Sequence, residues 1–180
     1  MIKVFDDVFL FKERQYYYQF IKDSNYKIGW PDQSSIETLY ELYFFSTYSS
    51  EDVQNLGILK DIGASDNANA EELRGLIKGR EPSLVVVNCD QFSTVHWPHT
   101  DSKPHRDVLL YYVNLEWNTE WYGETLFYDE GGQEISAAVS YRPGRVAFFD
   151  GNHPHAVRPS SRIAPNFRFT LSIFFDNEDH

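Results

Sequence analysis

A histidine and an aspartate two residues apart are the first feature of this sequence that could do chemistry. The stretch HWPHTD contains His99 and Asp101. In an extended segment, side chains at positions i and i+2 point to the same side, so an imidazole nitrogen and a carboxylate oxygen could bind one cation. A His-x-Asp tripeptide by itself is usually a solvated surface pair. A metal site therefore needs a third ligand from elsewhere in the chain.

Two further histidines, His153 and His155 in GNHPHAV, offer that third ligand after the segment RVAFFD. Two histidines and one carboxylate on one face of an ion, with open positions opposite, form the ligand set of non-haem Fe(II) oxygenases. Structural zinc sites are more often closed tetrahedra, many of them rich in cysteine, and Cys89 is the single cysteine here. The residue types therefore favour an open iron(II) site, and both histidines remain candidates.

The segment NFRFTLSIFF alternates with a period of two residues and carries an arginine. One face has Phe167, Phe169, Leu171, Ile173 and Phe175, and the other has Arg168, Thr170, Ser172 and Phe174. The polar face could lie in water on a half-exposed strand. It could instead line a pocket, where a buried guanidinium would need an anion such as a carboxylate. The second interpretation predicts a small carboxylic acid held by Arg168 close to the metal.

A similar pattern marks DVLLYYVNLEW, in which Tyr112 and Asn114 share a face with Val108 and Leu110. The polar tips of Tyr112 and Asn114 could line the same pocket. An ordinary core position with a satisfied hydroxyl is the alternative for Tyr112.

The elements that must position these residues change in character along the chain. Up to about residue 80 the sequence predicts helix and loop, with helical segments at 12–24, 34–45 (capped by Ser34 or Ser35) and 65–80. After Pro82 come short strand-like runs at 83–90, 107–117, 124–130, 144–151 and 167–176. This order predicts an α+β domain, mainly β, with an antiparallel sandwich or barrel at 83–176. A helical layer from residues 1–80 would cover one sheet, and no boundary divides the single domain 1–180.

The overall composition narrows the partners and the compartment. The 180 residues carry a formal net charge of −11, which disfavours a nucleic-acid backbone or an anionic membrane as partner. No apolar run approaches the roughly 20 residues of a membrane helix, and the N-terminus lacks a secretory signal core. One cysteine excludes an intrachain disulfide. We therefore expect a soluble, cytoplasmic protein.

Several segments, taken in order, resemble the Fe(II)/2-oxoglutarate-dependent dioxygenases, in particular the prolyl 4-hydroxylase-like branch. They are HTD, YYVNLEW, YGETLFY, YRPGRVAFFDGNHPHAV and FRFTLSIFF, which span the second half of the chain. The resemblance implies a double-stranded β-helix, or jelly roll, with N-terminal helices packed on one sheet. Two positions depart from the family pattern. Tyr122 stands where the first glycine of a turn often sits, and Cys89 or Asn88 falls where a tyrosine is usual.

The resemblance assigns roles to individual residues and adds no catalytic side chain beyond the metal and cosubstrate ligands. His99, Asp101 and His155 would bind the metal, with His153 as the competing third ligand. Arg168 would pair with the C5 carboxylate of 2-oxoglutarate, supported by Tyr112, Thr170 and Ser172. Trp97 and Trp121 would contribute to the substrate pocket, and structural packing is the alternative for both.

The implied activity is hydroxylation of a C–H bond with release of succinate and CO₂. It requires Fe(II), with 2-oxoglutarate and O₂ as cosubstrates, and ascorbate as a reductant. The branch implies a prolyl residue of a peptide or protein as substrate. One alternative is the same chemistry on a free amino acid or other small molecule. Another is a non-catalytic metal-binding jelly-roll module.

Overall fold

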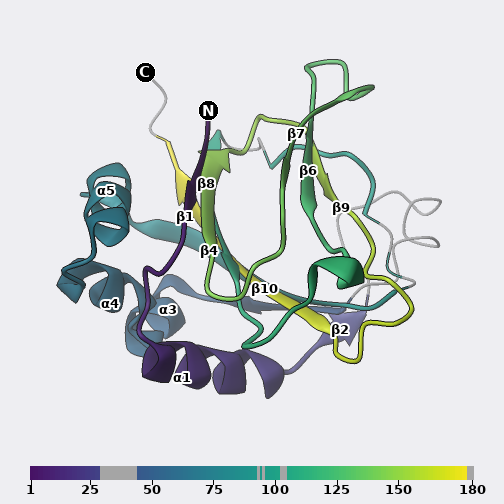
Figure 1. Ribbon diagram of the computed structural model, residues 1–180. Helices are drawn as coiled ribbons and strands as arrows, with labels where there is room; N and C mark the ends of the chain where they lie inside the picture. The colour runs from purple at the N-terminus through teal and green to yellow at the C-terminus, as the bar shows by residue number, and fades with distance from the viewer. Residues whose placement is uncertain (29–43, 93, 95, 102–104, 178–180) are drawn as a thin grey trace.

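The computed structural model describes residues 1–28, 44–92, 94, 96–101 and 105–177. Figure 1 shows two antiparallel sheets with the helices gathered on the outer side of one of them. The helix predicted at 34–45 lies outside the described residues as far as residue 43. Its last two residues were predicted wrongly, because they begin the strand Phe44–Tyr48.

The described helices begin and end where local signals place them. They are α1 (Phe11–Lys22), α3 (Ser50–Leu56), α4 (Ile58–Ala64) and α5 (Ala68–Ile77). Ser49 caps α3 by accepting a hydrogen bond from the Asp52 backbone, and the Asp52 carboxylate accepts one from the Ser49 N–H in return. Gly57 ends the same helix in the left-handed conformation, with φ of 80°. The predicted helices at 12–24 and 65–80 correspond to α1 and α5.

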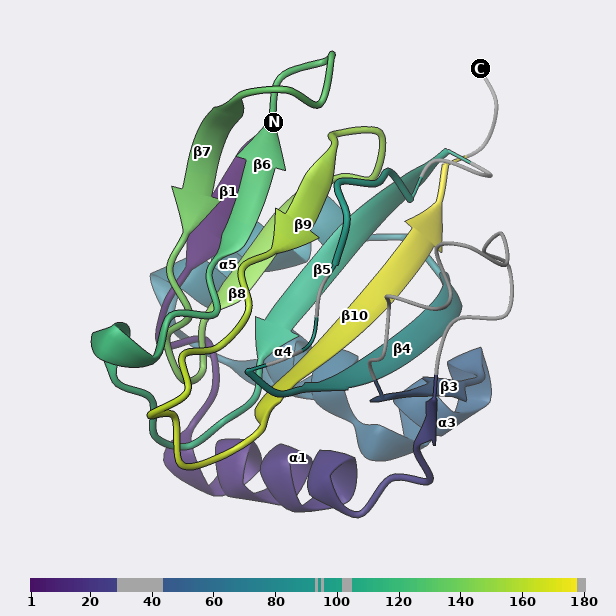
Figure 2. The same ribbon diagram turned by 90° about the vertical axis from the view of Figure 1, so that its right-hand side faces the viewer.

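Two antiparallel sheets face each other and form the barrel (Figure 2). The large sheet has the strand order β1-β8-β5-β10-β4-β3-β2, and the small sheet has the order β7-β6-β9. The large-sheet strands are β1 (Ile2–Phe5), β2 (Lys27–Ile28), β3 (Phe44–Tyr48), β4 (Pro82–Asp90), β5 (Arg106–Tyr112), β8 (Val146–Asp150) and β10 (Arg168–Asp176). The small-sheet strands are β6 (Thr125–Tyr128), β7 (Ile135–Val139) and β9 (His155–Val157).

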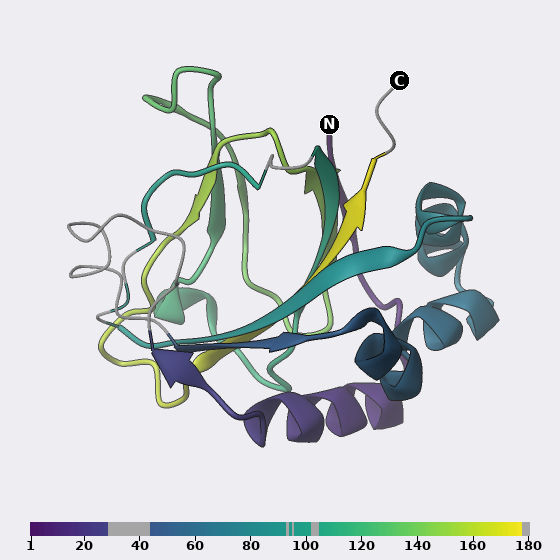
Figure 3. The same cartoon turned by 180° about the vertical axis from the view of Figure 1, so that it is seen from behind.

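The two faces of β10 serve two separate cores. Phe169, Leu171, Ile173 and Phe175 belong to the core between the large sheet and the helices. Phe174 belongs to the core between the two sheets, and Arg168, Thr170 and Ser172 share its side of the strand. Figure 3 shows the helices on the opposite side of the large sheet from the small one. The predicted α+β jelly-roll fold with helices on one sheet is confirmed.

The polar face of β10 is buried. Every residue of β10 from Arg168 to Phe175 is buried, so the half-exposed interpretation of this strand is wrong. The reason is that β10 lies between β4 and β5 in the middle of the large sheet, with one face under helices and the other under the small sheet.

The N-terminal half contains strands that the sequence did not indicate. The short segments β1, β2 and β3 extend the large sheet at its two edges. An edge strand of a few residues gains its stability from its partner strand, which a local pattern does not reveal. Asp6, just after β1, accepts hydrogen bonds from Arg145 Nε at 2.8 Å and Arg145 Nη2 at 2.9 Å. These bonds connect the end of β1 to the loop directly before β8. Hydrogen bonding to Arg145 lowers the pKa of Asp6.

No helix within the described part of the chain is long and apolar enough to cross a membrane.

Candidate metal centre and its surroundings

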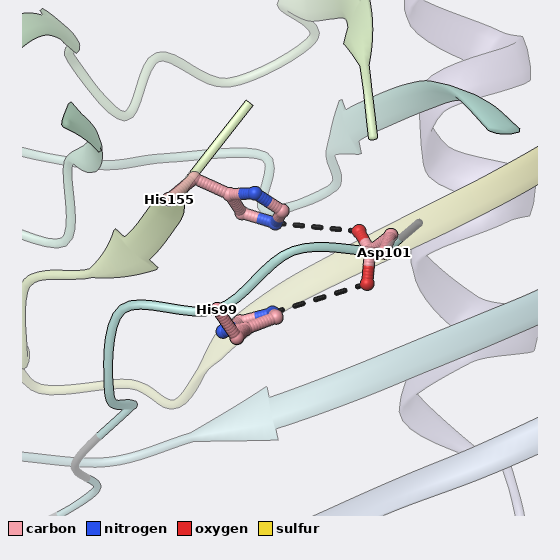
Figure 4. A group of neighbouring side chains, drawn as sticks. All are labelled: His99, Asp101 and His155. Carbon is pink, nitrogen blue, oxygen red and sulfur yellow. Dashed lines mark ion pairs between the residues drawn. The ribbon is translucent and has the colours of Figure 1, made fainter. Parts of the chain in front are cut away.

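His99, Asp101 and His155 lie together at one end of the barrel, with one ligand atom from each within 4.8 Å of the others (Figure 4). The Nε2 atom of His155 lies 3.3 Å from Asp101 Oδ2, and the Nε2 atom of His99 lies 3.9 Å from Asp101 Oδ1. His99 and Asp101 follow β4, whereas His155 begins β9 in the small sheet. The fold thus brings together residues more than fifty positions apart in the sequence.

Backbone hydrogen bonds fix the relative positions of the three residues. His99 and His155 form an isolated antiparallel bridge, in which each backbone N–H donates to the carbonyl of the other at 3.0 and 2.9 Å. The Asp101 N–H donates to the Gly151 carbonyl at 2.7 Å. The segment from His99 to Asp101 is therefore attached both to His155 itself and to Gly151, four residues before it, and the side chains are placed before any metal binds.

The hydrogen bonds of the two imidazoles determine which ring nitrogen is available. The Nδ1 atom of His99 lies 2.8 Å from the Trp97 carbonyl, and that of His155 lies 2.9 Å from the His153 carbonyl. Because a carbonyl oxygen only accepts, Nδ1 must carry the proton in each ring. In a neutral imidazole this leaves the lone pair on Nε2, the atom that faces Asp101 in both cases. This is the orientation that backbone partners impose on metal-bound histidines.

The surroundings of His99 and Asp101 favour the protonation states that bind a metal, a neutral imidazole and an ionised carboxylate. Burial and the neighbouring His155 ring lower the pKa of His99 below its ordinary value, although 44% of its side chain is exposed. Burial raises the pKa of Asp101, but the contact with His155 and the charge of Arg106 outweigh the effect of burial, and the pKa is lowered overall. Near neutral pH, His99 is therefore neutral and Asp101 is ionised.

This donor set fits a divalent cation. Two Nε2 lone pairs and a carboxylate repel one another unless a proton or a metal ion lies between them. Neutral imidazole nitrogens and a carboxylate oxygen are ligands for Fe(II), and three protein ligands leave coordination positions open. The arrangement can thus hold a metal and still admit further ligands.

Gly151 is a position where a side chain would disturb this group. A Cβ atom there would lie 2.9 Å from the Arg106 carbonyl oxygen and 3.1 Å from the Asp101 Cβ. We expect Gly151→Ala to displace Asp101 and to weaken Fe(II) binding by about tenfold or more, as disturbed support of metal ligands does. Anaerobic titration of Fe(II) would measure this. Gly75→Ala, on the exposed side of α5 with nothing within 4 Å of the new Cβ, is the matched control with unchanged metal affinity. Equal affinities in the two variants would contradict the expectation.

Arg168 is enclosed in the barrel interior, with 1% of its side chain exposed. Its Nε donates to the Gly123 carbonyl at 2.9 Å, and its Nη1 donates to Asp90 Oδ2 at 2.9 Å. Its Nη2 is buried and finds no hydrogen-bond partner among the described residues. Asn114 holds the backbone on both sides of Arg168, since its Nδ2 donates to the Phe167 carbonyl and its Oδ1 accepts from the Phe169 N–H, each at 2.8 Å.

The arginine and the metal-ligand group face the same small-sheet strand. Arg168 contacts Gly123, just before β6, while Phe127 on β6 pairs with His155 in β9. Between them, the Thr125 hydroxyl accepts a hydrogen bond from the Tyr112 hydroxyl at 2.8 Å. Gly123 to Phe127 is four residues, or roughly 13 Å of extended chain. The Arg168 contact and the metal-ligand group therefore lie along one short stretch of the barrel wall.

The side chains predicted to support a cosubstrate lie in this interior. Thr170 pairs with both Tyr112 on β5 and Asn88 on β4, and Ser172 lies two residues further along β10 on the same side. Thr170 and Ser172 are buried, as is Tyr112. The Tyr112 and Tyr141 rings flank the guanidinium, with their centroids 5.8 and 5.1 Å from Arg168 Cζ.

The two predicted pocket tryptophans have different surroundings. Trp97 is 49% exposed, so it is not a core residue, and its carbonyl accepts a hydrogen bond from His99 Nδ1. Trp121 packs edge-on against Trp117, which in turn stacks on Tyr141. Trp121 is thus the outer member of a row of rings that leads to Arg168.

His153, the competing third ligand, lies outside the group of three. Its ring packs edge-on against Phe127, and its Nε2 is buried without a hydrogen-bond partner among the described residues.

The two departures from the family pattern have structural counterparts. Tyr122 has φ of 58°, a left-handed backbone that explains why glycine is common at this point. Cys89 belongs to the helix-side core, so it does not face the barrel. Asn88 and Asp90 have the opposite parity on β4 and face Thr170 and Arg168.

Sequence reasoning missed Asp90 and its second partner, His96. The Asp90 carboxylate is bound by Arg168 through Oδ2 and lies 3.0 Å from His96 Nε2 through Oδ1. An acidic residue at the end of the apolar run SLVVVNCD was the available signal, because a buried carboxylate needs a cationic partner.

Comparison with known proteins identifies the family and the fold. A model of the 2OG-Fe(II) oxygenase superfamily matches residues 83–176. A comparison with curated proteins found no match. Among solved structures, the fold is similar to a prolyl hydroxylase from Trichoplax adhaerens in complex with a hypoxia inducible factor peptide, with a TM-score of 0.66 and 15% identity. That alignment covers 97% of this chain and 83% of the other.

Two further structures have the same fold. A Pseudomonas putida prolyl-4-hydroxylase is 13% identical with a TM-score of 0.66, over 98% of this chain and 92% of that one. The non-haem α-ketoglutarate-dependent carbocyclase SnoK from nogalamycin biosynthesis is 11% identical with a TM-score of 0.67, over 99% and 80%. Since the family model spans more than half of the sequence and includes the metal-ligand group, this chain belongs to the 2OG-Fe(II) oxygenase superfamily.

Proposed function

We propose that this protein is a 2-oxoglutarate-dependent dioxygenase that hydroxylates a C–H bond and releases succinate and CO₂. The observation that carries the proposal is the pairing of two sites in one barrel interior. One is the open group of two imidazoles and a carboxylate. The other is the buried Arg168, whose Nη2 has no hydrogen-bond partner within the part of the chain that the structure describes. The first fits Fe(II), and the second fits the distant carboxylate of 2-oxoglutarate.

In this proposal His99, Asp101 and His155 hold the iron through Nε2, a carboxylate oxygen and Nε2. Fe(II), when bound, supplies the activation of O₂ for the oxidation of 2-oxoglutarate and of the target C–H bond. The protein keeps both imidazoles oriented through the carbonyls of Trp97 and His153. It leaves one side of the metal free for the cosubstrates.

The cosubstrate's other end would be bound inside the barrel. Arg168 Nη2 donates to the C5 carboxylate in a place where water does not compete, since the surrounding residues are almost fully buried. Tyr112, Thr170 and Ser172 line this part of the interior and add hydroxyl groups around the carboxylate. The apolar residues of the inter-sheet core, such as Phe127 and Phe149, keep water from the space between the two sites.

The substrate we propose is a prolyl residue in a peptide or protein. Support comes from the similarity to two prolyl hydroxylases, one of them in complex with a peptide fragment. Trp97 and Tyr122 present exposed aromatic surface beside the metal-ligand group and Gly123, where a peptide could pack. A small molecule is the second candidate, because the fold is equally similar to that of the carbocyclase SnoK from nogalamycin biosynthesis.

The remaining assignments follow the same chemistry. Ascorbate would act as reductant for the iron. A reducing, cytoplasmic location is supported by the single buried Cys89. The formal net charge of −11 disfavours nucleic acid as substrate.

Anaerobic visible absorption tests the proposal. We expect a new absorption band only when both Fe(II) and 2-oxoglutarate are added to the metal-free protein, and we expect EDTA to remove it. Admission of air should then start the release of succinate. A panel of peptides and a panel of amino acids would show which class of compound accelerates this release. Absence of the band in a folded, metal-loaded protein would overturn the dioxygenase proposal. Tightly held zinc without succinate release would favour a non-catalytic metal-binding module.

A further inference from the structure

Asp90 places a second carboxylate in the site that Arg168 would offer to the cosubstrate. It ends β4 directly opposite Arg168, and 2% of its side chain is exposed. Oδ2 accepts a hydrogen bond from Arg168 Nη1 at 2.9 Å, and Oδ1 lies 3.0 Å from His96 Nε2. Both oxygens are thus engaged within the protein.

The Asp90 carboxylate is ionised. Burial raises the pKa of Asp90, but His96 and Arg168 outweigh the effect of burial and lower the pKa overall. Arg168 therefore has an internal counter-charge, which avoids the cost of an unpaired guanidinium in the interior.

The remaining capacity of Arg168 is limited. Nε is used by the Gly123 carbonyl and Nη1 by Asp90, which leaves Nη2 as the nitrogen without a partner among the described residues. The flanking rings of Tyr112 and Tyr141 narrow the approach to the guanidinium. A carboxylate received on Nη2 would share one guanidinium with Asp90. Two carboxylates this close repel each other in a poorly solvated interior.

We propose that Asp90 shares Arg168 with the carboxylate of the cosubstrate and lowers the protein's affinity for this cosubstrate. This inference rests on the proposed function, because it takes Arg168 as the cosubstrate site. Asp90 holds the Arg168 guanidinium in the free protein. The carboxylate of the cosubstrate therefore binds in spite of electrostatic repulsion from the Asp90 carboxylate.

The test compares Asp90→Asn with wild type. Asparagine keeps the size of the side chain and an oxygen that accepts from Nη1, and its amide can donate to His96 Nε2. Anaerobic titration of 2-oxoglutarate into the Fe(II) protein, followed by absorption, should give a Kd about tenfold or more below that of wild type. Without 2-oxoglutarate the variant should unfold at a lower temperature, and 2-oxoglutarate should raise its Tm by more than it raises that of wild type.

Asp176→Asn is the matched control. Asp176 lies at the other end of β10 and pairs with Arg106 at 2.7 Å. This substitution also removes an aspartate from its arginine, but Asp176 lies at the exposed end of β10 away from Arg168, so the Kd for 2-oxoglutarate should be unchanged.

The outcomes separate this proposal from the proposed function. Equal or weaker 2-oxoglutarate binding in Asp90→Asn, with the absorption band present, would overturn the proposal and make Asp90 a residue that positions Arg168. If wild type gives no band, the proposed function fails. In that case the inference about Asp90 is tested by the Tm of each metal-free protein with and without 2-oxoglutarate. If 2-oxoglutarate raises the Tm of Asp90→Asn by no more than it raises that of wild type, the inference is overturned. If Asp90→Asn does not fold, Asp90→Ser, which also keeps an acceptor, takes its place.

Discussion

Asp101→Ala is expected to abolish Fe(II) binding and turnover while the protein remains folded. Loss of a supporting residue alone costs a metal site about 10- to 100-fold in affinity, so loss of a ligand should cost about 100-fold or more. The fold should persist because the backbone N–H of residue 101 keeps its hydrogen bond to the Gly151 carbonyl. Among the described residues, the Asp101 carboxylate forms ion pairs with the two imidazoles that it faces, so its removal breaks no contact that holds the fold together.

Fe(II) affinity by anaerobic titration, succinate release and the far-ultraviolet circular dichroism spectrum would measure these effects together. His155→Ala should behave in the same way. His153→Ala is the matched control, because it removes the neighbouring imidazole and keeps the carbonyl that orients His155. Retained iron binding in His155→Ala combined with loss in His153→Ala would transfer the third ligand to His153.

The sequence was sufficient to predict the pair of ligands that lie close together in the chain, but not to choose the third ligand, which comes from a distant segment. His99 and Asp101 are close because of spacing within one extended segment, so local geometry was sufficient to pair them. The choice between His153 and His155 depends on the isolated bridge that joins His99, in the segment after β4, to His155 in β9, and spacing alone left this choice open. Family resemblance favoured His155, the histidine that the structure places beside Asp101.

Prediction of the fold likewise succeeded where a local pattern was sufficient and failed where an element depends on a distant partner. The strands between residues 83 and 176 with strong alternation or β-rich composition were predictable, because each pattern reports the burial of its own faces. β7 and β9 were missed because they are short and gain their stability from pairing with β6. The Asp90–Arg168 contact joins residues 78 positions apart, and its local signal was one acidic residue at the end of an apolar strand.

Arg168→Ala is expected to destabilise the protein by about 3–5 kcal/mol, as removal of one partner from a buried ion pair does. Arg168 and Asp90 have 1% and 2% of their side chains exposed, so Asp90 would be left buried with His96 as its remaining charged partner among the described residues. Urea unfolding of the metal-free protein measures the loss. Lys3→Ala is the control, since Lys3 pairs with Glu72 at 2.6 Å with 31% and 55% of the side chains exposed. An exposed pair of this kind contributes at most about 1 kcal/mol.

The double variant Asp90→Asn/Arg168→Gln separates folding from cosubstrate binding. It removes both charges and keeps amide groups that can hydrogen-bond to each other, so we expect it to recover most of the stability lost in Arg168→Ala. It should still bind 2-oxoglutarate about 10- to 100-fold more weakly than wild type, because the charge-assisted hydrogen bond from Nη2 is gone. Recovery of both the stability and the affinity for 2-oxoglutarate would mean that Arg168 serves only as the counter-charge of Asp90. Recovery of stability alone would place the cosubstrate carboxylate on the guanidinium, since the interior would then be folded, neutral and missing only that donor.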